Sequence, residues 1–371
     1  MIDYIWQYYF EIEPLLHEKV MQVIRNCSCY KYPMKLEIAL TNACNQNCIH
    51  CSNFGPSHKT NQIDLETIDN LLKYESVQIV LTGGEPFLHP NIFEIINKIK
   101  INTGSFVKIC SNGILLDKET CRQLKKTGID KFDTLQISLD AATSQTYRKI
   151  RGIGFQSVID NISNIKQYID CTLEIHYVPI LDNFRELHDI MKIALDAKAD
   201  IFSASPLANL GNADNLQEVP TEILVEQEYY IIQQLKDTPT YYQGKLFEWS
   251  MVADKISLYK YNKKTPTIYK CGAGTETLYI NSDKKVYPCV YLKHDDFNLG
   301  ILGKNNFGDI IVKGKNLFGN GFSYDKSSCE HCKLLGVCNG GCIGIAYQKN
   351  GKFVPGMDGR CALQKSSSVL H

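Results

Sequence analysis

Residues 34–211 alternate between short apolar strands and amphipathic helices, and this alternation restricts the fold more than any other feature of the chain. Repeated units of one strand and one helix build a parallel sheet that is covered by helices. Six units predict an α/β fold, a partial (β/α)6 barrel rather than a closed eightfold barrel, with a flat doubly wound sheet as the alternative. The predicted strands span residues 36–40, 77–81, 106–110, 135–140, 173–178 and 201–205, and the predicted helices span residues 64–73, 91–100, 117–127, 155–168 and 183–197.

Polar motifs follow several of these predicted strands. In both candidate folds the active site lies at the carboxyl ends of the strands, where such motifs would meet. The motif Gly83-Gly84-Glu85-Pro86 follows the second strand. Its two glycines permit close approach of the backbone to a ligand, and Glu85 offers a carboxylate to an ammonium group.

The strand at residues 135–140 has one apolar and one polar face. Because side chains alternate along a strand, Gln136, Ser138 and Asp140 share the face opposite to the leucines and isoleucine between them. We expect this polar face to look into the barrel. By the same parity, the inward face also carries Glu37, Gln78, Lys108, Cys110 and His176, which are candidate substrate contacts.

Cysteines form a front set and a rear set. The front set is Cys44, Cys48 and Cys51, and an iron–sulfur cube normally takes four cysteines. Three thiolates would therefore leave one iron open to a substrate. The rear set contains Cys271, Cys289, Cys329, Cys332, Cys338, Cys342 and Cys361.

The front cysteines, the GGEP motif and the polar strand together resemble the radical S-adenosylmethionine (radical SAM) enzymes over about residues 34–210. The resemblance implies that the front cysteines hold a [4Fe-4S] cluster whose open iron binds S-adenosylmethionine (SAM). Reductive cleavage of SAM would then give a 5′-deoxyadenosyl radical that takes hydrogen from an unactivated carbon, while the protein positions the substrate. The residues implied to contact SAM are His50 at the adenine, Gly83, Gly84 and Glu85 at the amine, Ser138 and Asp140 at the ribose, and Arg151 at the carboxylate.

Each of these SAM contacts has a plainer alternative. Asp140 could cap a helix or loop, and His50 could be a packed ring without a ligand. Arg151 could be a surface arginine, and Arg148 competes with it for the same role.

The rear cysteines resemble the SPASM domain, the auxiliary-cluster domain of radical SAM maturases, at all seven positions. The resemblance implies two auxiliary [4Fe-4S] clusters, and three in the whole chain. One would use Cys329, Cys332, Cys338 and Cys361, and the other Cys271, Cys289 and Cys342. Thr265 occupies the place of an eighth cysteine. The cluster at Cys271, Cys289 and Cys342 is therefore expected to have an open iron or a ligand other than cysteine. The alternative is structural zinc at residues 329–342.

Composition excludes several partner classes. Lys plus Arg equals Asp plus Glu at 40 each, so no net field favours nucleic acid or an anionic membrane. The chain lacks an apolar run long enough for a spanning helix, and its first residues do not form a basic signal sequence. Fifteen cysteines without such a signal favour metal ligation in a reducing cytoplasm.

The predicted organisation is an N-terminal lead (1–33), a radical SAM core (34–211), a bridging region (212–270) and the SPASM domain (271–371). The resemblance implies a peptide maturase that forms a thioether or carbon–carbon crosslink, or oxidises its substrate. Expected partners are a peptide or protein substrate and a low-potential electron donor such as flavodoxin or ferredoxin, and the resemblance also allows a separate peptide-recognition protein.

Three alternatives to this function remain. Maturation of a sulfatase would suit the chain length, but such maturases carry an acidic residue where this chain has Val290. Oxidation of a small metabolite is the next alternative. A zinc-stabilised binding protein without catalysis is the alternative from a different class.

Overall fold

The computed structural model describes residues 33–53, 60–244, 268–269, 271–323, 330 and 341–353. The predicted N-terminal lead lies almost wholly outside these residues, as does Thr265. Four of the predicted rear ligands also lie outside them, namely Cys329, Cys332, Cys338 and Cys361.

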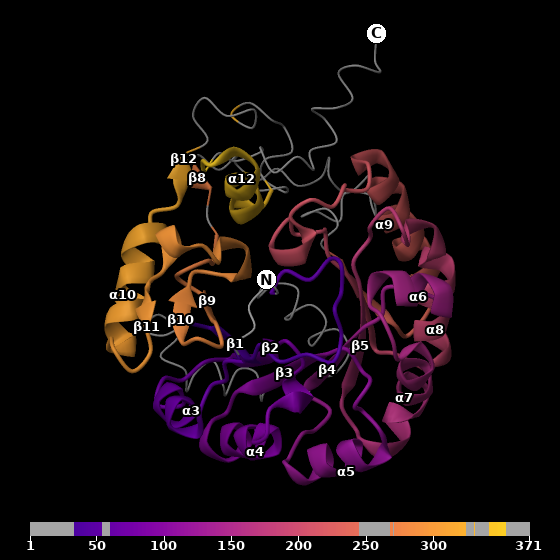
Figure 1. Ribbon diagram of the computed structural model, residues 1–371, viewed down its shortest axis with the longest axis horizontal. Helices are drawn as coiled ribbons and strands as arrows, with labels where there is room; N and C mark the ends of the chain where they lie inside the picture. The colour runs from indigo at the N-terminus through magenta and orange to yellow at the C-terminus, as the bar shows by residue number, and fades with distance from the viewer. Residues whose placement is uncertain are drawn as a thin grey trace.

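A single curved sheet of ten strands organises the structure, in the order β11-β10-β9-β1-β2-β3-β4-β5-β6-β7 (Figure 1). Strands β1 to β7 pair in parallel, each with its successor, which confirms the predicted partial barrel. Its strands are β1 (Lys35–Thr41), β2 (Gln78–Gly83), β3 (Phe106–Ser111), β4 (Thr134–Ser138), β5 (Thr172–Tyr177), β6 (Ile201–Ala204), β7 (Tyr241–Gly244), β9 (Thr277–Ile280), β10 (Lys285–Tyr287) and β11 (Gly300–Ile301), and a second sheet pairs β8 (Ile268–Tyr269) with β12 (Phe322–Ser323).

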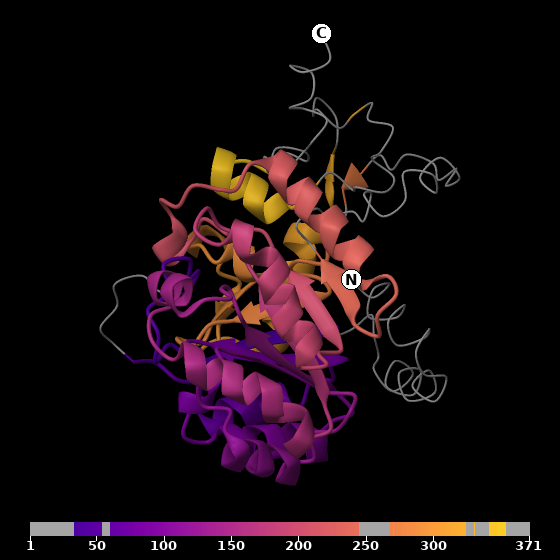
Figure 2. The same ribbon diagram turned by 90° about the vertical axis from the view of Figure 1, so that its right-hand side faces the viewer.

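Helices line the outer side of the curved sheet, as both views show (Figures 1 and 2). The five helices predicted in the barrel region are present, within a few residues of their expected bounds. The structure adds α6, which is too short for its two buried residues to give a periodic pattern. The helices are α3 (Leu65–Leu71), α4 (Ile92–Asn102), α5 (Lys118–Lys126), α6 (Ser144–Ile150), α7 (Phe155–Tyr168), α8 (Leu187–Asp196), α9 (Thr221–Leu235), α10 (Phe307–Phe318) and α12 (Ile343–Asn350).

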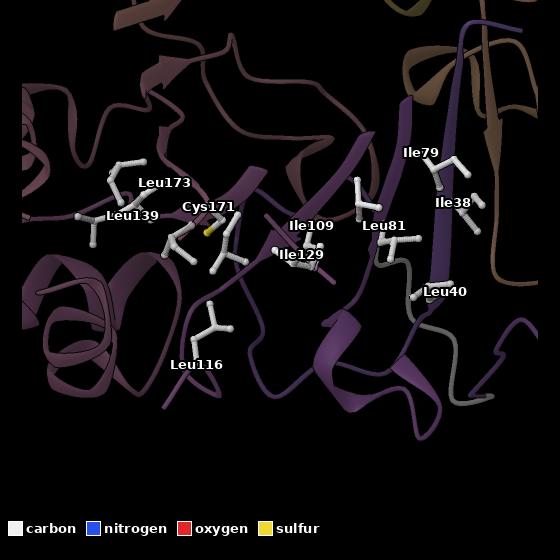
Figure 3. Packing of buried hydrophobic residues seen from close by; sticks show 14 of the residues in the cluster. Ile38, Leu40, Ile79, Leu81, Ile109, Leu116, Ile129, Leu139, Cys171 and Leu173 are labelled. Atoms are coloured by element: carbon white, nitrogen blue, oxygen red, sulfur yellow. The ribbon is translucent and has the colours of Figure 1, made fainter. Parts of the chain in front are cut away.

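Side chains on the outer face of the sheet form the main core, together with the buried sides of the helices. Ile38, Leu81, Ile109 and Leu173 come from four different strands and lie in one continuous layer (Figure 3). Burial of such side chains contributes on the order of 1.5–3 kcal/mol each. Cys171 is in the same layer, as a buried thiol.

The opposite face of the sheet is polar, as the alternation predicts. Cys110, Gln136 and Glu174 are register partners on β3, β4 and β5, so they share one face, and their apolar neighbours in sequence face the helices. This inward face carries the predicted candidates for substrate contact.

Local signals set the helix ends. Asp64 is the N-cap of α3, because its carboxylate accepts a hydrogen bond from the Thr67 amide. Asn91 precedes α4, but its side chain makes no capping hydrogen bond. Gly128 follows Thr127, the C-cap of α5, with φ +88°, the left-handed conformation that glycine tolerates best.

Strands β9, β10 and β11 of the C-terminal segment belong to the same sheet as the barrel. β9 pairs in parallel with β1, from Lys35 opposite Thr277 to Ile38 opposite Ile280, and β10 and β11 continue antiparallel beyond it. The segments assigned above to two domains thus share one hydrogen-bonded sheet, and the exact domain boundaries stay predictions. None of the helices in the described part of the chain is long and apolar enough to cross a membrane.

Candidate functional site

The front cysteines lie in the loop that leaves β1 at its carboxyl end. Cys44, Cys48 and Cys51 are partly exposed and outside any disulfide. The amide of Cys51 donates to the carbonyl of Cys48 (3.3 Å), which folds the end of the loop into a turn. Cys48 is close enough to the other two thiols to interact electrostatically with both. The three thiols therefore gather at the strand edge where the fold predicts a site.

The GGEP motif holds the first part of this loop. The Gly84 amide donates to the Thr41 carbonyl (2.7 Å), and the Glu85 amide donates to the Ala43 carbonyl (2.8 Å). A Cβ atom on Gly84 would lie 2.1 Å from the Ala43 oxygen, closer than any real contact. The close approach that the two glycines permit is thus to the backbone of the cysteine loop.

We expect Gly84→Ala to displace the cysteine loop, because the added methyl group overlaps a backbone oxygen that cannot rotate away. The expected loss of stability is about 1–3 kcal/mol, together with reduced iron content after reconstitution. Iron analysis and urea unfolding measure the two effects. Gly303→Ala is the control for backbone strain without overlap: nothing lies within 4 Å of its Cβ position, but its φ of +83° strains alanine, so we expect some loss of stability with full iron content. Full iron content in Gly84→Ala would contradict this packing argument.

Glu85 is completely buried and joins the GGEP motif to the carboxyl end of β3. Its carboxylate accepts hydrogen bonds from the Asn112 amide (2.8 Å), the Ser111 hydroxyl (2.9 Å) and the Phe87 amide (3.2 Å). Burial raises the pKa of Glu85 to about 7, although these hydrogen bonds act in the opposite direction. The carboxylate therefore changes its charge near neutral pH.

Asp140 lies at the centre of a buried ion cluster that we call the Asp140 cluster, formed by Asp140, Arg151 and His50. Its Oδ2 accepts from Arg151 Nε (2.6 Å), Arg151 Nη2 (2.5 Å) and His50 Nε2 (3.0 Å), and its Oδ1 accepts from the Val178 amide (2.8 Å). Although burial opposes ionisation, the adjacent Arg151 guanidinium and His50 hold the pKa of Asp140 well below its usual range. Arg151 is thus a buried partner of Asp140 rather than a surface residue.

His50 is the member of the Asp140 cluster with an unused polar atom. Its Nε2 faces a carboxylate and so carries a proton, which makes Nδ1 an acceptor in the neutral ring. Nδ1 is buried and has no hydrogen-bond partner among the described residues. Buried polar atoms rarely lack partners, so this atom fits a site that receives a donor from a ligand.

A directed chain of hydrogen bonds crosses the inward face beside the Asp140 cluster. Lys108 Nζ pairs with Glu174 Oε2 (2.5 Å), and Ser203 donates to Glu174 Oε1 (2.6 Å). Because the Ser203 proton is used in this way, His176 Nδ1 must donate to Ser203 (2.8 Å), and Nε2 accepts from Ser205 (2.8 Å). Burial lowers the pKa of His176 to about 4, so the ring is neutral at pH 7. His176 is next to Ser138 in the register of β4 and β5.

Three of the rear cysteines are described, and they lie together. Cys289 interacts electrostatically with both Cys271 and Cys342, and burial raises the pKa of its thiol. Cys271 and Cys289 pack on a second apolar cluster around Leu292 and Phe318. The structure thus brings together the three residues that were assigned to one auxiliary cluster.

In the described part of the chain, no three His, Cys, Asp or Glu side chains converge closely enough to share one metal ion. An iron–sulfur cube has a separate iron atom for each thiolate, so it does not require such convergence. The partly exposed thiols and the orphan nitrogen of His50 fit a larger group at this edge.

Two residues of the site were missed from the sequence. Glu174 lies two residues before His176 on β5, so both side chains point to the inward face, and this alternation could have identified Glu174. Lys293 donates to the loop directly after Cys51, and only the three-dimensional structure reveals this contact.

Comparison with known proteins agrees with this geometry. The Radical SAM superfamily matches residues 38–194. The chain is 26% identical to the AdoMet-dependent heme synthase of Methanosarcina barkeri, over 87% of this chain and 94% of that protein. It is 25% identical to the mycofactocin maturase MftC of Mycobacterium ulcerans, over 85% of this chain and 84% of the relative.

The fold also occurs among solved structures. The complex of Streptococcus suis SuiB with its precursor peptide SuiA superposes with a TM-score of 0.69, over 93% of this chain and 80% of that chain. The sequence identity is 17%, so this likeness concerns the fold.

Proposed function

We propose that this chain, whose residues 38–194 match the Radical SAM superfamily, modifies a peptide or protein by hydrogen abstraction. One observation carries the proposal. Cys44, Cys48 and Cys51 share one edge of the barrel with buried Glu85 and the Asp140 cluster, so three thiols, a carboxyl group and a guanidinium group lie at the same end of the sheet. When bound, a [4Fe-4S] cluster and SAM supply a 5′-deoxyadenosyl radical at such a site.

The proposed roles follow the positions of the side chains. Cys44, Cys48 and Cys51 hold the front cluster. Glu85 offers a carboxylate to the SAM amine, and Gly83 and Gly84 hold the loop beside it.

The Asp140 cluster supplies the remaining SAM contacts. Arg151 offers charge to the SAM carboxylate, and His50 offers its free Nδ1 to the adenine side of the molecule. Ser138 faces the ribose. Because four donors already occupy the Asp140 carboxylate, Asp140 supports SAM chiefly through Arg151 and His50, and a ribose hydroxyl would share one of its oxygens.

The rear cysteines would hold two further [4Fe-4S] clusters. Cys271, Cys289 and Cys342 serve one, and Cys329, Cys332, Cys338 and Cys361 serve the other. Such clusters can accept the electron that remains on the substrate after hydrogen abstraction. A low-potential electron donor such as flavodoxin or ferredoxin would reduce the front cluster. Such donors are found in the cytoplasm, which is the proposed location of the protein.

Two similar proteins favour a peptide substrate. MftC is named as a maturase, and SuiB was solved with a precursor peptide. A peptide substrate is therefore our first candidate, with a separate peptide-recognition protein as a possible partner. Modification of a small metabolite is the second, because the heme synthase aligns over 94% of its own length.

Anaerobic purification tests the proposal directly. We expect about twelve irons per chain with matching sulfide, and reductive cleavage of SAM by dithionite-reduced protein. Zinc without sulfide would end the enzyme hypothesis in favour of a zinc-stabilised binding protein. SAM cleavage stimulated by a peptide encoded beside the gene would separate the peptide candidate from the metabolite candidate.

The affinity for SAM should rise with pH through neutrality. The SAM ammonium favours the ionised form of Glu85, so a carboxyl group with a pKa of about 7 must release its proton when SAM binds. Below pH 7 we expect the dissociation constant to increase by up to about tenfold per pH unit.

The matched variant for this prediction is Glu85→Gln. It should bind SAM more weakly by about 1–3 kcal/mol, with a flatter pH dependence. Titration of SAM itself contributes equally to both proteins, so the difference between their profiles isolates Glu85. Identical profiles would exclude contact between Glu85 and the amine.

A further inference from the structure

Lys293 connects the C-terminal segment with the front cysteine loop. It ends the short 3-10 helix η5 (Val290–Leu292), which begins directly after Cys289. Its Nζ donates to the Ser52 carbonyl (2.8 Å) and to Asn53 Oδ1 (2.7 Å). These acceptors are the first two residues after Cys51, so one lysine side chain holds the exit of the loop.

Asn53 connects Lys293 with the sheet through hydrogen bonds to two strands. Its Oδ1 also accepts from the hydroxyl of the buried Tyr279 on β9 (3.0 Å), and its Nδ2 donates to the Gly83 carbonyl (3.0 Å). Lys293 Nζ lies 5.9 Å from the centre of the Tyr279 ring, a favourable position for a cation. Asn53 is thus held by the C-terminal segment through Lys293 and Tyr279, and by the barrel through Gly83.

Lys293 has no carboxylate in direct contact within the described part of the chain. Among the described residues it forms no ion pair, whereas Lys108 on the same side of the sheet pairs with Glu174. Both hydrogen-bond acceptors of Lys293 are neutral. Burying a cation without a counter-charge is unfavourable, and burial lowers the pKa of Lys293 to about 8.

The groups that favour the charged form of Lys293 are Cys51, Asp283 and Glu37, and Cys51 has the largest effect. Lys293 therefore lies close to a cysteine of the front set. A cluster held by three thiolates carries more negative charge than a single thiolate.

We propose that Lys293 is a positioning residue of the front iron–sulfur cluster. Its side chain holds Ser52 and Asn53, directly after Cys51, and places a cation beside the cluster. The inference rests on the proposed function, because it requires the front cysteines to hold that cluster. Reduction adds one negative charge to the cluster. A nearby cation stabilises the reduced form, so Lys293 raises the reduction potential.

The test is a redox titration of the full-length protein, with the front cluster followed by the change that SAM causes in its electron paramagnetic resonance spectrum. For Lys293→Met we expect the equilibrium at a fixed potential to shift about tenfold toward the oxidised cluster, which corresponds to 59 mV for one electron. Lys293→Arg should restore the potential because it retains the charge. Lys285→Met is the control, since Lys285 pairs with Asp295 at the surface.

An unchanged potential in Lys293→Met would overturn the proposal, and so would a shift that Lys293→Arg fails to reverse. If Lys293→Met does not assemble the cluster, Asn53→Asp replaces it, because a carboxylate of the same shape would neutralise Lys293. The same direction of shift is then expected, and no shift would overturn the proposal. Wild-type protein that assembles the cluster but fails to cleave SAM would refute the proposed function without deciding the role of Lys293.

Discussion

Replacing Cys44, Cys48 and Cys51 together by alanine should abolish SAM cleavage and remove about a third of the iron. The three thiols occupy one loop at the carboxyl edge of the barrel, where Arg151 Nη1 approaches Cys48 Sγ (3.8 Å) and Asn112 Nδ2 approaches Cys44 Sγ (3.9 Å). Without them the front cluster has no protein ligands, while the two auxiliary clusters keep their cysteine ligands. Iron analysis and chromatographic detection of 5′-deoxyadenosine measure the two effects.

The control for this variant is Cys121→Ala, because Cys121 is a buried thiol of α5 in the main core and was assigned to no cluster. Its iron content and SAM cleavage should match the wild type. Survival of SAM cleavage in the triple variant would show that the front cysteines do not hold the catalytic cluster.

Asp140→Ala should cause the largest loss of stability among single substitutions in the site. It leaves the buried Arg151 guanidinium without its counter-charge, and breaking a buried ion pair in this way costs about 3–5 kcal/mol. SAM affinity should fall as well, because Arg151 and His50 lose the carboxylate that orients them. Urea unfolding at pH 7 and calorimetric titration with SAM measure these losses.

A surface pair gives the matched control. Lys149 and Asp182 also form a salt bridge, but both are more exposed, so Asp182→Ala should change stability by about 0–1 kcal/mol. The pH dependence gives a second check. Because the folded pKa of Asp140 is lowered, its contribution is complete above its unfolded pKa and is lost only as the solution becomes strongly acidic. Equal losses for the two variants would contradict the central role of the buried pair.

The sequence was sufficient to predict the barrel because its strands are regular. Leu135 and Ile137 alternate with Gln136 and Ser138, and one side of this pattern is buried while the other faces inward. The C-terminal part was harder to predict, since β9, β10 and β11 are two to four residues long. Strands this short have too few residues to show a period of two.

The site was predicted less completely, because contacts across the sheet do not follow from spacing. Strand parity placed Asp140 with Ser138, but β4 ends at Ser138, and the chain then turns Asp140 toward Arg151. The two glycines of GGEP were predicted to approach a ligand, and the structure places them against the cysteine loop itself. The His50 nitrogen without a partner and the reach of Lys293 could be recognised only in three dimensions.

The pairing of β9 with β1 gives the C-terminal segment a protective role. β1 would otherwise be an outer strand, with its backbone groups unpaired along one side and the apolar Leu36, Ile38 and Leu40 beneath it. An open edge of that kind recruits strands from other molecules. A fragment cut near residue 270 would therefore be prone to self-association, so the cluster-bearing segment is not a detachable module but the piece that closes the barrel sheet against aggregation.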